Sequence, residues 1–356
     1  MKTLLLVILT TISVSAKSQS YFDVELQKFV HQKLIDVAFD KSDVEAAAVL
    51  VQKTKTGEII CSKALNRREE ELVETDVSTF EIPGCVVAKP ILLFAMASKT
   101  NIDSLFVETG NGLLELDEYT IVDFPAYRYG GYGCLSVMSA FLLNSNIGIL
   151  KGCQRAFNMS MREYGNAMSR VGIIEGDNPS SYDCLLEDRP FNGYEILGNR
   201  TYMSMYEIIA WFSAVAYSSN LLLILQDDDS RVPFRTIKDR NNLPLLRNAL
   251  RKHVTEGLSH QAMSKKVEIA GFSDVSGEDV DRDRICLFAG YASPDNPQYT
   301  VVVAIKEHHR GGTYLPCKIG REILEKLYLT TTNMKTSACF LGNKDSYQPH
   351  RAEKGR

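Results

Sequence analysis

Two side chains that could act as a nucleophile and its neighbouring base stand near the start of one apolar segment. A Pro-Gly pair breaks the chain, and the following residues 85–97 are apolar apart from Lys89, which predicts a buried helix. Cys85 and Lys89 are four residues apart, so both lie on the same face of that helix. A cysteine thiolate beside an ammonium group is a nucleophile. The simpler alternative is that Cys85 is an inert, packed thiol, while Lys89 hydrogen-bonds to Asn146 or to backbone groups, or extends toward solvent.

Two asparagines form a second polar group. Asn144 and Asn146 separate the apolar segments 135–143 and 147–157, which are predicted to be helices. An amide cannot relay a proton as a hydroxyl group does. We therefore expect the two side chains to form a polar bridge between the helices or to contact a ligand, and not to transfer protons.

Ser273 and Asp274 form a third polar group, directly after a strand predicted at residues 267–272. Polar side chains at the edge of a sheet can bind a substrate, but a cap or turn at the end of the strand is the simpler role. An ionised Asp274 would repel a nearby anionic substrate.

The elements that must position these residues change type along the chain. Helices are predicted at 21–36, 85–97, 135–143, 147–157, 204–217, 245–258 and 319–328, and strands at 46–54, 58–63, 267–272, 285–292 and 299–307. An early helix and hairpin thus precede a helical middle, and strands and a last helix follow. This order predicts an α+β fold, in which helices and a helical subdomain flank one antiparallel sheet completed by distant segments.

Composition narrows the possible functions. The chain has 356 residues, of which 45% are hydrophobic and 24% charged, so it can form a core of useful size without metals or disulfides. A net charge of -4 gives no indication of a nucleic-acid-binding surface. Beyond the N-terminus no apolar stretch reaches the roughly 18 residues of a membrane helix.

The two ends of the chain differ from the rest. Lys2, the apolar run 4–12 and the small residues that end at Ala16 are typical of a secretory signal peptide, predicted at residues 1–16. The protein is then exported to the periplasm or the extracellular space and soluble after cleavage. The alternative is an uncleaved N-terminal helix. Residues 335–356 are polar and are predicted to form a disordered tail, which leaves 17–334 as one domain.

The cysteines give no indication of a metal site. They are scattered without a C-x-x-C pair: Cys61, Cys85, Cys134, Cys153, Cys184, Cys286, Cys317 and Cys339. Most are predicted to be buried small apolar residues, although export would permit disulfides. His308 and His309 supply too few ligands for a metal by themselves. We expect neither a metal nor a cofactor.

Several segments together resemble one known arrangement. In chain order these are Thr56–Ile59, Gly84–Lys89 with Pro90, Glu108–Gly112, Thr120–Asp123, Tyr132–Leu135, Asn144–Gly148, Ile269–Gly271, Phe288–Ala292 and Asp295–Val301. Their order is similar to that of the penicillin-binding transpeptidase domain, from about Ala46 to Tyr328. The resemblance implies the sheet and helices that these enzymes share with serine β-lactamases. It also implies a Ser-x-x-Lys helix start, a Ser-x-Asn cluster and a Lys-Thr-Gly strand edge that act together in acyl transfer.

All three of these motifs are altered here. Val86 stands three residues before Lys89, where the family has its serine, and Cys85 stands four residues before it. Asn144 replaces the serine of Ser-x-Asn, while Asn146 matches the family's asparagine. Phe272-Ser273-Asp274 stands where the family has Lys-Thr-Gly. The cation that would attract a carboxylate and the glycine that lets substrate approach are both lost.

Two functional hypotheses follow from the resemblance. The first is an impaired homologue. It would bind peptidoglycan stem peptides or β-lactams weakly or not at all, or it would bind a cell-envelope protein. The alternative is an active D,D-transpeptidase or carboxypeptidase-type acyl-transferase that uses Cys85 and Lys89. In both, the candidate binding residues are the motif-equivalent positions Asn144, Asn146, Ser273 and Asp274. A copy without any retained role is a third, less informative possibility.

Overall fold

The computed structural model describes residues 23–40, 43–69, 71–116, 119–173, 190–222, 235–276, 283–308 and 312–342. The predicted signal peptide, residues 1–16, and residues 343–356 of the predicted tail lie outside the described residues. No helix in the described part of the chain is long and apolar enough to cross a membrane.

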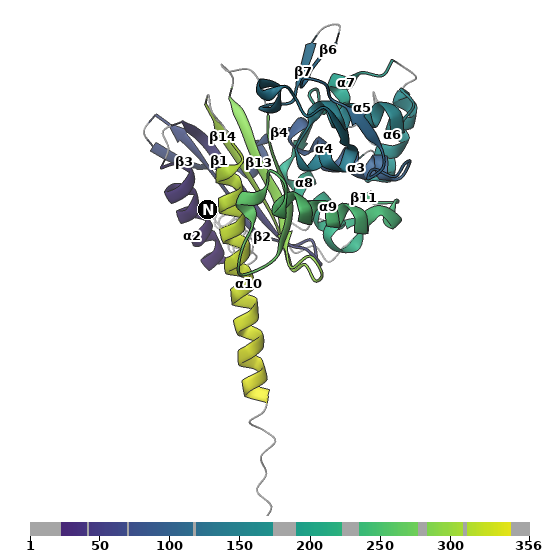
Figure 1. The fold of residues 1–356 in the computed structure, drawn as a ribbon. Coiled ribbons are helices and arrows are strands. Elements are labelled where there is room, and N and C mark those ends of the chain that lie inside the picture. The colour runs from purple at the N-terminus through teal and green to yellow at the C-terminus, as the bar shows by residue number, and fades with distance from the viewer. Residues whose placement is uncertain are drawn as a thin grey trace, which may run out of the picture.

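One six-stranded antiparallel sheet forms the centre of the molecule, in the order β12-β13-β14-β1-β2-β3 (Figure 1). The strands are β1 (Val44–Lys53), β2 (Ile59–Arg68), β3 (Glu71–Thr75), β12 (Ile269–Val275), β13 (Arg284–Ala292) and β14 (Tyr299–Glu307). β1 pairs with β14, with Val49 opposite Val303. The first and last strands of this sheet in chain order therefore lie side by side at its centre. The edge strand β12 carries the predicted Ser273 and Asp274.

The sheet is apolar on both faces, which explains the dense apolar run of β1. Ala46, Ala48 and Leu50 belong to one hydrophobic core, and Ala47, Val49 and Val51 to the other. Alternate side chains of a strand point to opposite faces. The second core is covered by α2 (Val24–Lys33) and α10 (Tyr314–Gly342), and the first by the helical subdomain (Figure 1).

The helical subdomain is built around α3 (Cys85–Ala97), a helix buried along nearly its whole length. Around it lie α4 (Val137–Leu142), α5 (Asn146–Ala156), α6 (Met161–Arg170), α7 (Gly193–Ile196), α8 (Met205–Ser213) and α9 (Leu243–Thr255). Serine caps begin several of these helices: Ser145 accepts from Gly148 N, and Ser204 forms a reciprocal capping box with Glu207. The Ser145 cap lies in the loop between α4 and α5, which carries Asn144, and helps to hold that loop in place.

Four two-stranded pairings complete the fold. They join β4 (Glu81–Pro83) to β9 (Tyr202–Ser204), β5 (Phe106–Glu108) to β8 (Cys134–Ser136), β6 (Leu113–Leu116) to β7 (Tyr119–Val122), and β10 (Asn220–Leu221) to β11 (Arg235–Thr236). Short 3-10 turns lie at Val77–Thr79, Ala126–Tyr129, Arg240–Asn242 and His260–Ala262, and π-helical turns at Leu34–Ala38 and Ala214–Ser218.

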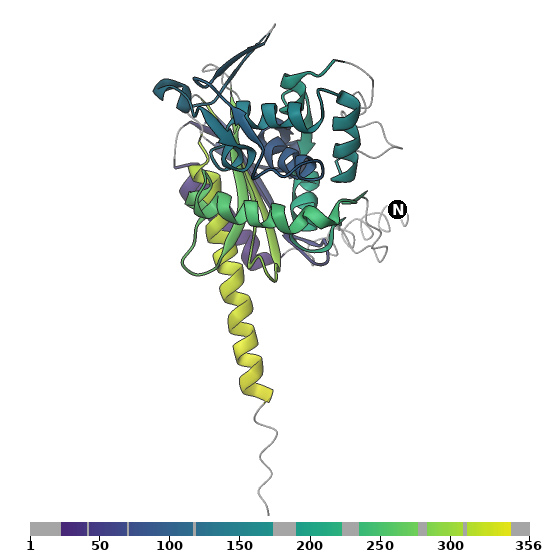
Figure 2. The same cartoon turned by 45° about the vertical axis from the view of Figure 1, so that its right-hand side comes forward.

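The predicted α+β architecture is confirmed, with differences at element ends. The segment predicted as a helix from 135 begins with β8, because the side chain of Ser136 accepts from Ser139 N and starts α4 only after it. The last helix, expected at 319–328, runs from Tyr314 to Gly342 and projects from the sheet (Figures 1 and 2). It therefore overlaps the first residues of the predicted tail.

Candidate functional site

Lys89 and Asp274 form a buried ion pair where α3 meets the edge strand β12. The Lys89 side chain lies on α3 with 5% of its surface exposed, and that of Asp274 lies on β12 with 10% exposed. The distance from Lys89 Nζ to Asp274 Oδ2 is 2.5 Å. The first and third motif-like segments are thus bound directly to each other.

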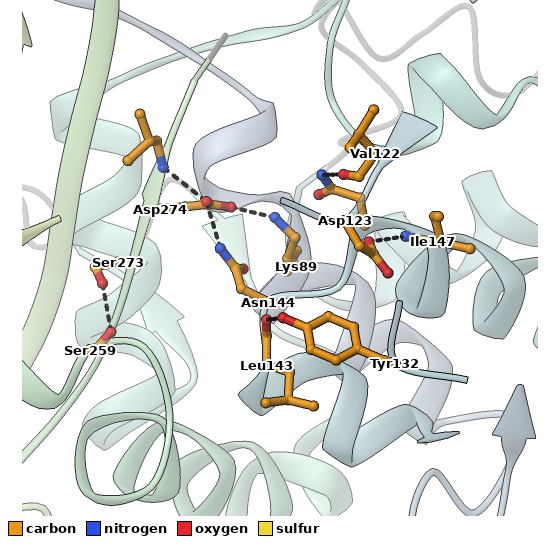
Figure 3. Close-up of polar contacts among 12 residues, drawn as sticks. Lys89, Val122, Asp123, Tyr132, Leu143, Asn144, Ile147, Ser259, Ser273 and Asp274 are labelled. Carbon is orange, nitrogen blue, oxygen red and sulfur yellow. Dashed lines mark hydrogen bonds and ion pairs between the residues drawn. The ribbon is translucent and has the colours of Figure 1, made fainter. Parts of the chain in front are cut away.

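Asn144 completes a three-residue contact with this carboxylate. Its Nδ2 donates to Asp274 Oδ1 at 2.7 Å, and the Val275 backbone N–H donates to the same oxygen at 2.9 Å. Asn144 has a positive φ of 58°, a conformation that asparagine tolerates better than most residues. Figure 3 shows Lys89 and Asn144 converging on Asp274 from two elements. Asp274 therefore contacts one residue from each of the other two motif-like segments, while the buried Asn144 Oδ1 has no hydrogen-bond partner among the described residues.

Asn146 does not take part in this contact. Its Nδ2 donates to the Val122 carbonyl at 3.0 Å, which ties the start of α5 to β7. The neighbouring Ser145 Oγ donates to Asp123 Oδ2 at 2.5 Å, and Ile147 N donates to Asp123 Oδ1 at 3.0 Å. Burial raises the pKa of Asp123, while the Ser145 hydroxyl and the Ile147 amide act against this rise. In the second motif Asn146 thus contacts β7 and Asn144 contacts β12, whereas the sequence interpretation expected a polar bridge between the two helices.

Phe272, which the sequence resemblance aligns with the family's motif lysine, lies wholly in the core. Its ring stacks on Phe141 with centroids 5.5 Å apart and lies 4.7 Å from the ring of His253. His253 is itself fully buried, and its desolvation, with a smaller effect of Lys89, lowers its pKa to about 3. An apolar cluster therefore fills the position where the resemblance implies a substrate-binding cation.

Ser273 points away from Asp274, because neighbouring residues of a strand face opposite sides. Its Oγ lies 2.8 Å from Ser259 Oγ, which in turn lies 2.8 Å from His253 Nδ1. All three side chains are buried. Ser273 is thus part of an internal polar chain, separate from the contacts of Lys89.

Cys85 begins α3 and is partly buried. Burial raises the pKa of its thiol to about 12, and Asp274 contributes to the rise; Lys89 and the backbone amides at the helix start oppose it only in part. The fraction of thiolate at neutral pH is then very small. Four other described cysteines, Cys61, Cys153, Cys286 and Cys317, are buried as predicted, while Cys134 is exposed.

Two hollows in the described structure lie away from these residues. One of about 350 Å³ lies beside α9 and is lined by Val254, Met263 and Ile269 among others. Another of about 240 Å³ lies between α10 and the β13–β14 turn, next to Asn296 and Tyr328. Neither is lined by Lys89, Asn144 or Asp274.

One cluster outside this site has the side chains that metals prefer. Ligand atoms of Glu45, Asp283 and His308 lie within 4.8 Å of one another. The Lys306 ammonium, however, lies 2.8 Å from an oxygen of each carboxylate. A cation is therefore already bound between the two acids, and we assign no metal to them.

Sequence reasoning did not identify Asp123, His253 or Ser259 as parts of the site. Asp123 ends the motif-like segment Thr120–Asp123. The resemblance rests on the position of that segment along the chain and assigns no role to the carboxylate. His253 lies on a helix with basic neighbours, and nothing in that pattern indicates burial. Their polar contacts span 6 to 24 residues and depend on tertiary packing.

The fold is similar to those of solved penicillin-binding transpeptidase domains. A peptidoglycan glycosyltransferase from Burkholderia ambifaria matches 86% of this chain and 97% of its own, with 21% identity and a TM-score of 0.65. The TP domain of Burkholderia pseudomallei penicillin-binding protein 3 matches 88% and 95%, with 20% identity and a TM-score of 0.64. The transpeptidase domain of a D,D-transpeptidase from Legionella pneumophila matches 85% and 96%, with 15% identity and a TM-score of 0.57.

No protein-family model and no curated protein matches the sequence. At 15–21% identity, the structural similarity shows the fold alone. The chain therefore has the penicillin-binding transpeptidase-like fold that its sequence motifs indicate.

Proposed function

We propose that this chain is a non-catalytic homologue of penicillin-binding transpeptidases that binds peptidoglycan. The observation that carries the proposal is the bridge from Asp274 to Lys89 and Asn144. In the family's chemistry a lysine accepts the proton of the nucleophile. Here the Lys89 ammonium is paired with a buried carboxylate at 2.5 Å, so it has no lone pair for that role.

The binding site for a substrate carboxylate is altered in the same way. In the family's arrangement the strand edge presents a cation, whereas here Phe272 is packed in the core and Asp274 brings a negative charge. In a poorly solvated site, two carboxylates repel each other strongly. These features argue against binding of an anionic substrate at this site, so the proposal places peptidoglycan recognition on other surfaces.

A second candidate function is acyl transfer by Cys85 with Lys89. It is favoured by the position of Cys85 at the start of a helix, one turn before a lysine. In such a reaction Sγ would attack a carbonyl carbon, the scissile C–N bond would break, and the leaving nitrogen would take up a proton. The thiol pKa of about 12 argues against it, because little thiolate forms at neutral pH.

Incubation with a labelled penicillin, followed by intact-mass analysis, separates the two candidates. We expect no adduct on the wild-type protein and none on Cys85→Ala. Site-resolved alkylation of Cys85 by iodoacetamide should also show no ionisation step between pH 6 and 9. Cys134, which is exposed, serves as the reactive control in the same digest. An adduct that disappears in Cys85→Ala but persists in Cys134→Ala would establish the acyl-transferase.

The binding role needs its own measurement. The protein should co-sediment with purified, insoluble peptidoglycan in the presence of excess penicillin, because the former catalytic centre is not the binding surface. Absence of co-sedimentation with and without penicillin would refute the proposed role. Export through residues 1–16 belongs to the same proposal, and a mature N-terminus near residue 17 in the secreted fraction is the expected result.

A further inference from the structure

A short turn next to the site exposes several aromatic side chains. The turn consists of residues Phe124–Tyr129 and directly follows Asp123; we call it the aromatic turn. Phe124 is 57% exposed and Tyr129 is 85% exposed, values that are high for large rings. The turn follows β7, which with β6 projects at the top of Figure 1. Val122 pairs with Leu113, so the turn begins at the base of this hairpin, and the rings of Phe124 and Tyr129 reach solvent there.

Arg128 lies over two of these rings. Its guanidinium carbon is 4.7 Å from the centroid of Phe124 and 5.8 Å from that of Tyr127, and its Nε donates to the Tyr127 hydroxyl at 3.4 Å. Within the described part of the chain, no carboxylate pairs with Arg128. The turn thus presents an exposed cation that the rings hold in one orientation.

Backbone contacts make the aromatic turn rigid. Tyr127 N donates to the Asp123 carbonyl at 3.0 Å, and Gly131 N donates to the Ala126 carbonyl at 2.9 Å. Gly112 packs so closely that a Cβ there would lie 2.9 Å from Tyr127 Cα. The Asp123 carboxylate in turn binds Ser145 and the start of α5. A ligand that binds the turn therefore meets side chains that are already ordered, which lowers the entropic cost of binding.

The combination of a free ring and a fixed cation suits a particular ligand chemistry. The C–H face of a sugar ring packs on an exposed aromatic ring, and a guanidinium group pairs with a carboxylate. We propose that the aromatic turn binds a carboxylate-bearing glycan, with a sugar ring on Tyr129 and the carboxylate on Arg128. This inference rests on the proposed function, and it identifies the glycan strand as the part of peptidoglycan that is recognised.

The size of the patch favours a glycan over a protein partner. Among residues 107–133, the exposed large apolar side chains are Leu113, Phe124 and Tyr129. A stable protein interface usually takes about 800 Å² from each partner, contributed by roughly 20 residues or more. One free ring and one cation instead match a single small sugar unit. A glycan strand presents the same unit many times along its length.

Three soluble probes test the inference on the full-length protein by calorimetry. They are glycan strands freed of peptides by an amidase, which carry lactyl carboxylates; neutral chitohexaose; and free stem peptide, which carries carboxylates without sugars. We expect the anionic strands to bind best. Tyr129→Ala should weaken their binding roughly five- to tenfold, and Arg128→Gln about three- to fivefold. Chitohexaose should bind more weakly, and its affinity should not respond to Arg128→Gln.

A matched pair elsewhere on the molecule supplies the control. Tyr314 is 50% exposed, and Lys318 lies 6.0 Å from its ring centroid. Tyr314→Ala and Lys318→Gln should leave the affinity for the strands unchanged. All four side chains reach solvent, so the variants should fold, which thermal unfolding verifies.

Several outcomes would overturn the inference. The first is that the glycan strands bind the wild type and Tyr129→Ala equally well. The second is that neither glycan binds. The third is that the stem peptide binds as tightly as the glycan strands. A protein ligand that requires the turn while no glycan binds would also overturn it. If insoluble peptidoglycan still sediments Tyr129→Ala as it does the wild type, the proposed function stands and this inference alone fails.

Discussion

At the scale of single residues, Asp274 changes the character of the whole site. The sequence resemblance aligns it with the glycine of Lys-Thr-Gly, and its carboxylate accepts from Lys89, Asn144 and the Val275 amide. On sequence grounds we expected Asp274 to cap the strand end and to repel an anionic ligand. The structure instead places it against Lys89, so that the same charge neutralises the lysine. A single acidic side chain thus pairs with Lys89 and also places a negative charge in the site, and the non-catalytic proposal rests in part on both effects.

The strength of this pair can be measured by a double-mutant cycle. Lys89→Met and Asp274→Asn each leave one buried charge without its partner, so each should lower the free energy of unfolding by about 3–5 kcal/mol. The double variant should lose much less than the sum, because neither charge remains. Urea unfolding at pH 7 gives the four values.

The exposed pair Lys99 and Glu163, 2.6 Å apart, provides the control for this cycle. Its single variants should each cost about 1 kcal/mol or less, because solvent screens both charges. If Lys89→Met proved equally mild, the buried pair would not persist in solution. Lys89 would then be available as a base, and the non-catalytic proposal would lose its main support.

At the scale of elements, the sequence indicates some boundaries well and others poorly. The predicted helix at 85–97 matches α3 from Cys85 to Ala97, because a Pro-Gly break and a continuous apolar run mark it. The end of α10 was not predicted, since its threonine-rich last turns have no apolar period. The pairing of Lys89 with Asp274 was also missed, because these residues are 185 positions apart and local pattern carries no information on which charges meet.

The packing of α10 on the sheet depends on one glycine. A Cβ on Gly320 would lie 2.4 Å from Cδ1 of Phe288, a fully buried residue of β13. In an exposed helix, Gly→Ala stabilises by about 1 kcal/mol. Here the overpacked ring should reverse the sign, and Gly320→Ala should lower the free energy of unfolding by about 1–3 kcal/mol in urea titrations.

Two companion variants isolate the cause. Gly312→Ala has no atom within 4 Å of the new Cβ and should change stability by about 0.5 kcal/mol or less. Phe288→Leu removes the ring, so adding Gly320→Ala to it should cost less than in the wild type. A stabilising Gly320→Ala would show that α10 does not sit this close to the sheet.

At the scale of the whole molecule, two cores share one sheet, and the contacts of Lys89, Asn144 and Asp274 lie where the helical subdomain meets the sheet's edge. Phe272 and His253 lie at this junction, with centroids 4.7 Å apart, and Phe141 from α4 completes the cluster. In the described structure, His253 Nε2 is buried without a hydrogen-bond partner. The junction between subdomain and sheet is therefore sealed by packing that tolerates a neutral imidazole but not a charged one.

This junction predicts how acid affects the stability of the whole fold. The pKa of His253 falls from 6.5 to about 3 on folding, chiefly through burial and then through Lys89. Below pH 6.5 the unfolded chain binds a proton that the folded chain does not, so stability is lost as the pH falls. The loss should be roughly 1 kcal/mol between pH 6 and pH 5.

In His253→Phe this loss should disappear from that interval, although the variant is less stable at pH 7 because Ser259 loses a partner. Carboxylates with lowered pKa values, such as Asp283 and Glu325, affect both proteins alike and titrate at lower pH. Urea unfolding of both proteins at pH 7, 6, 5.5 and 5 measures the difference, and parallel profiles would show that His253 is solvated and the junction open.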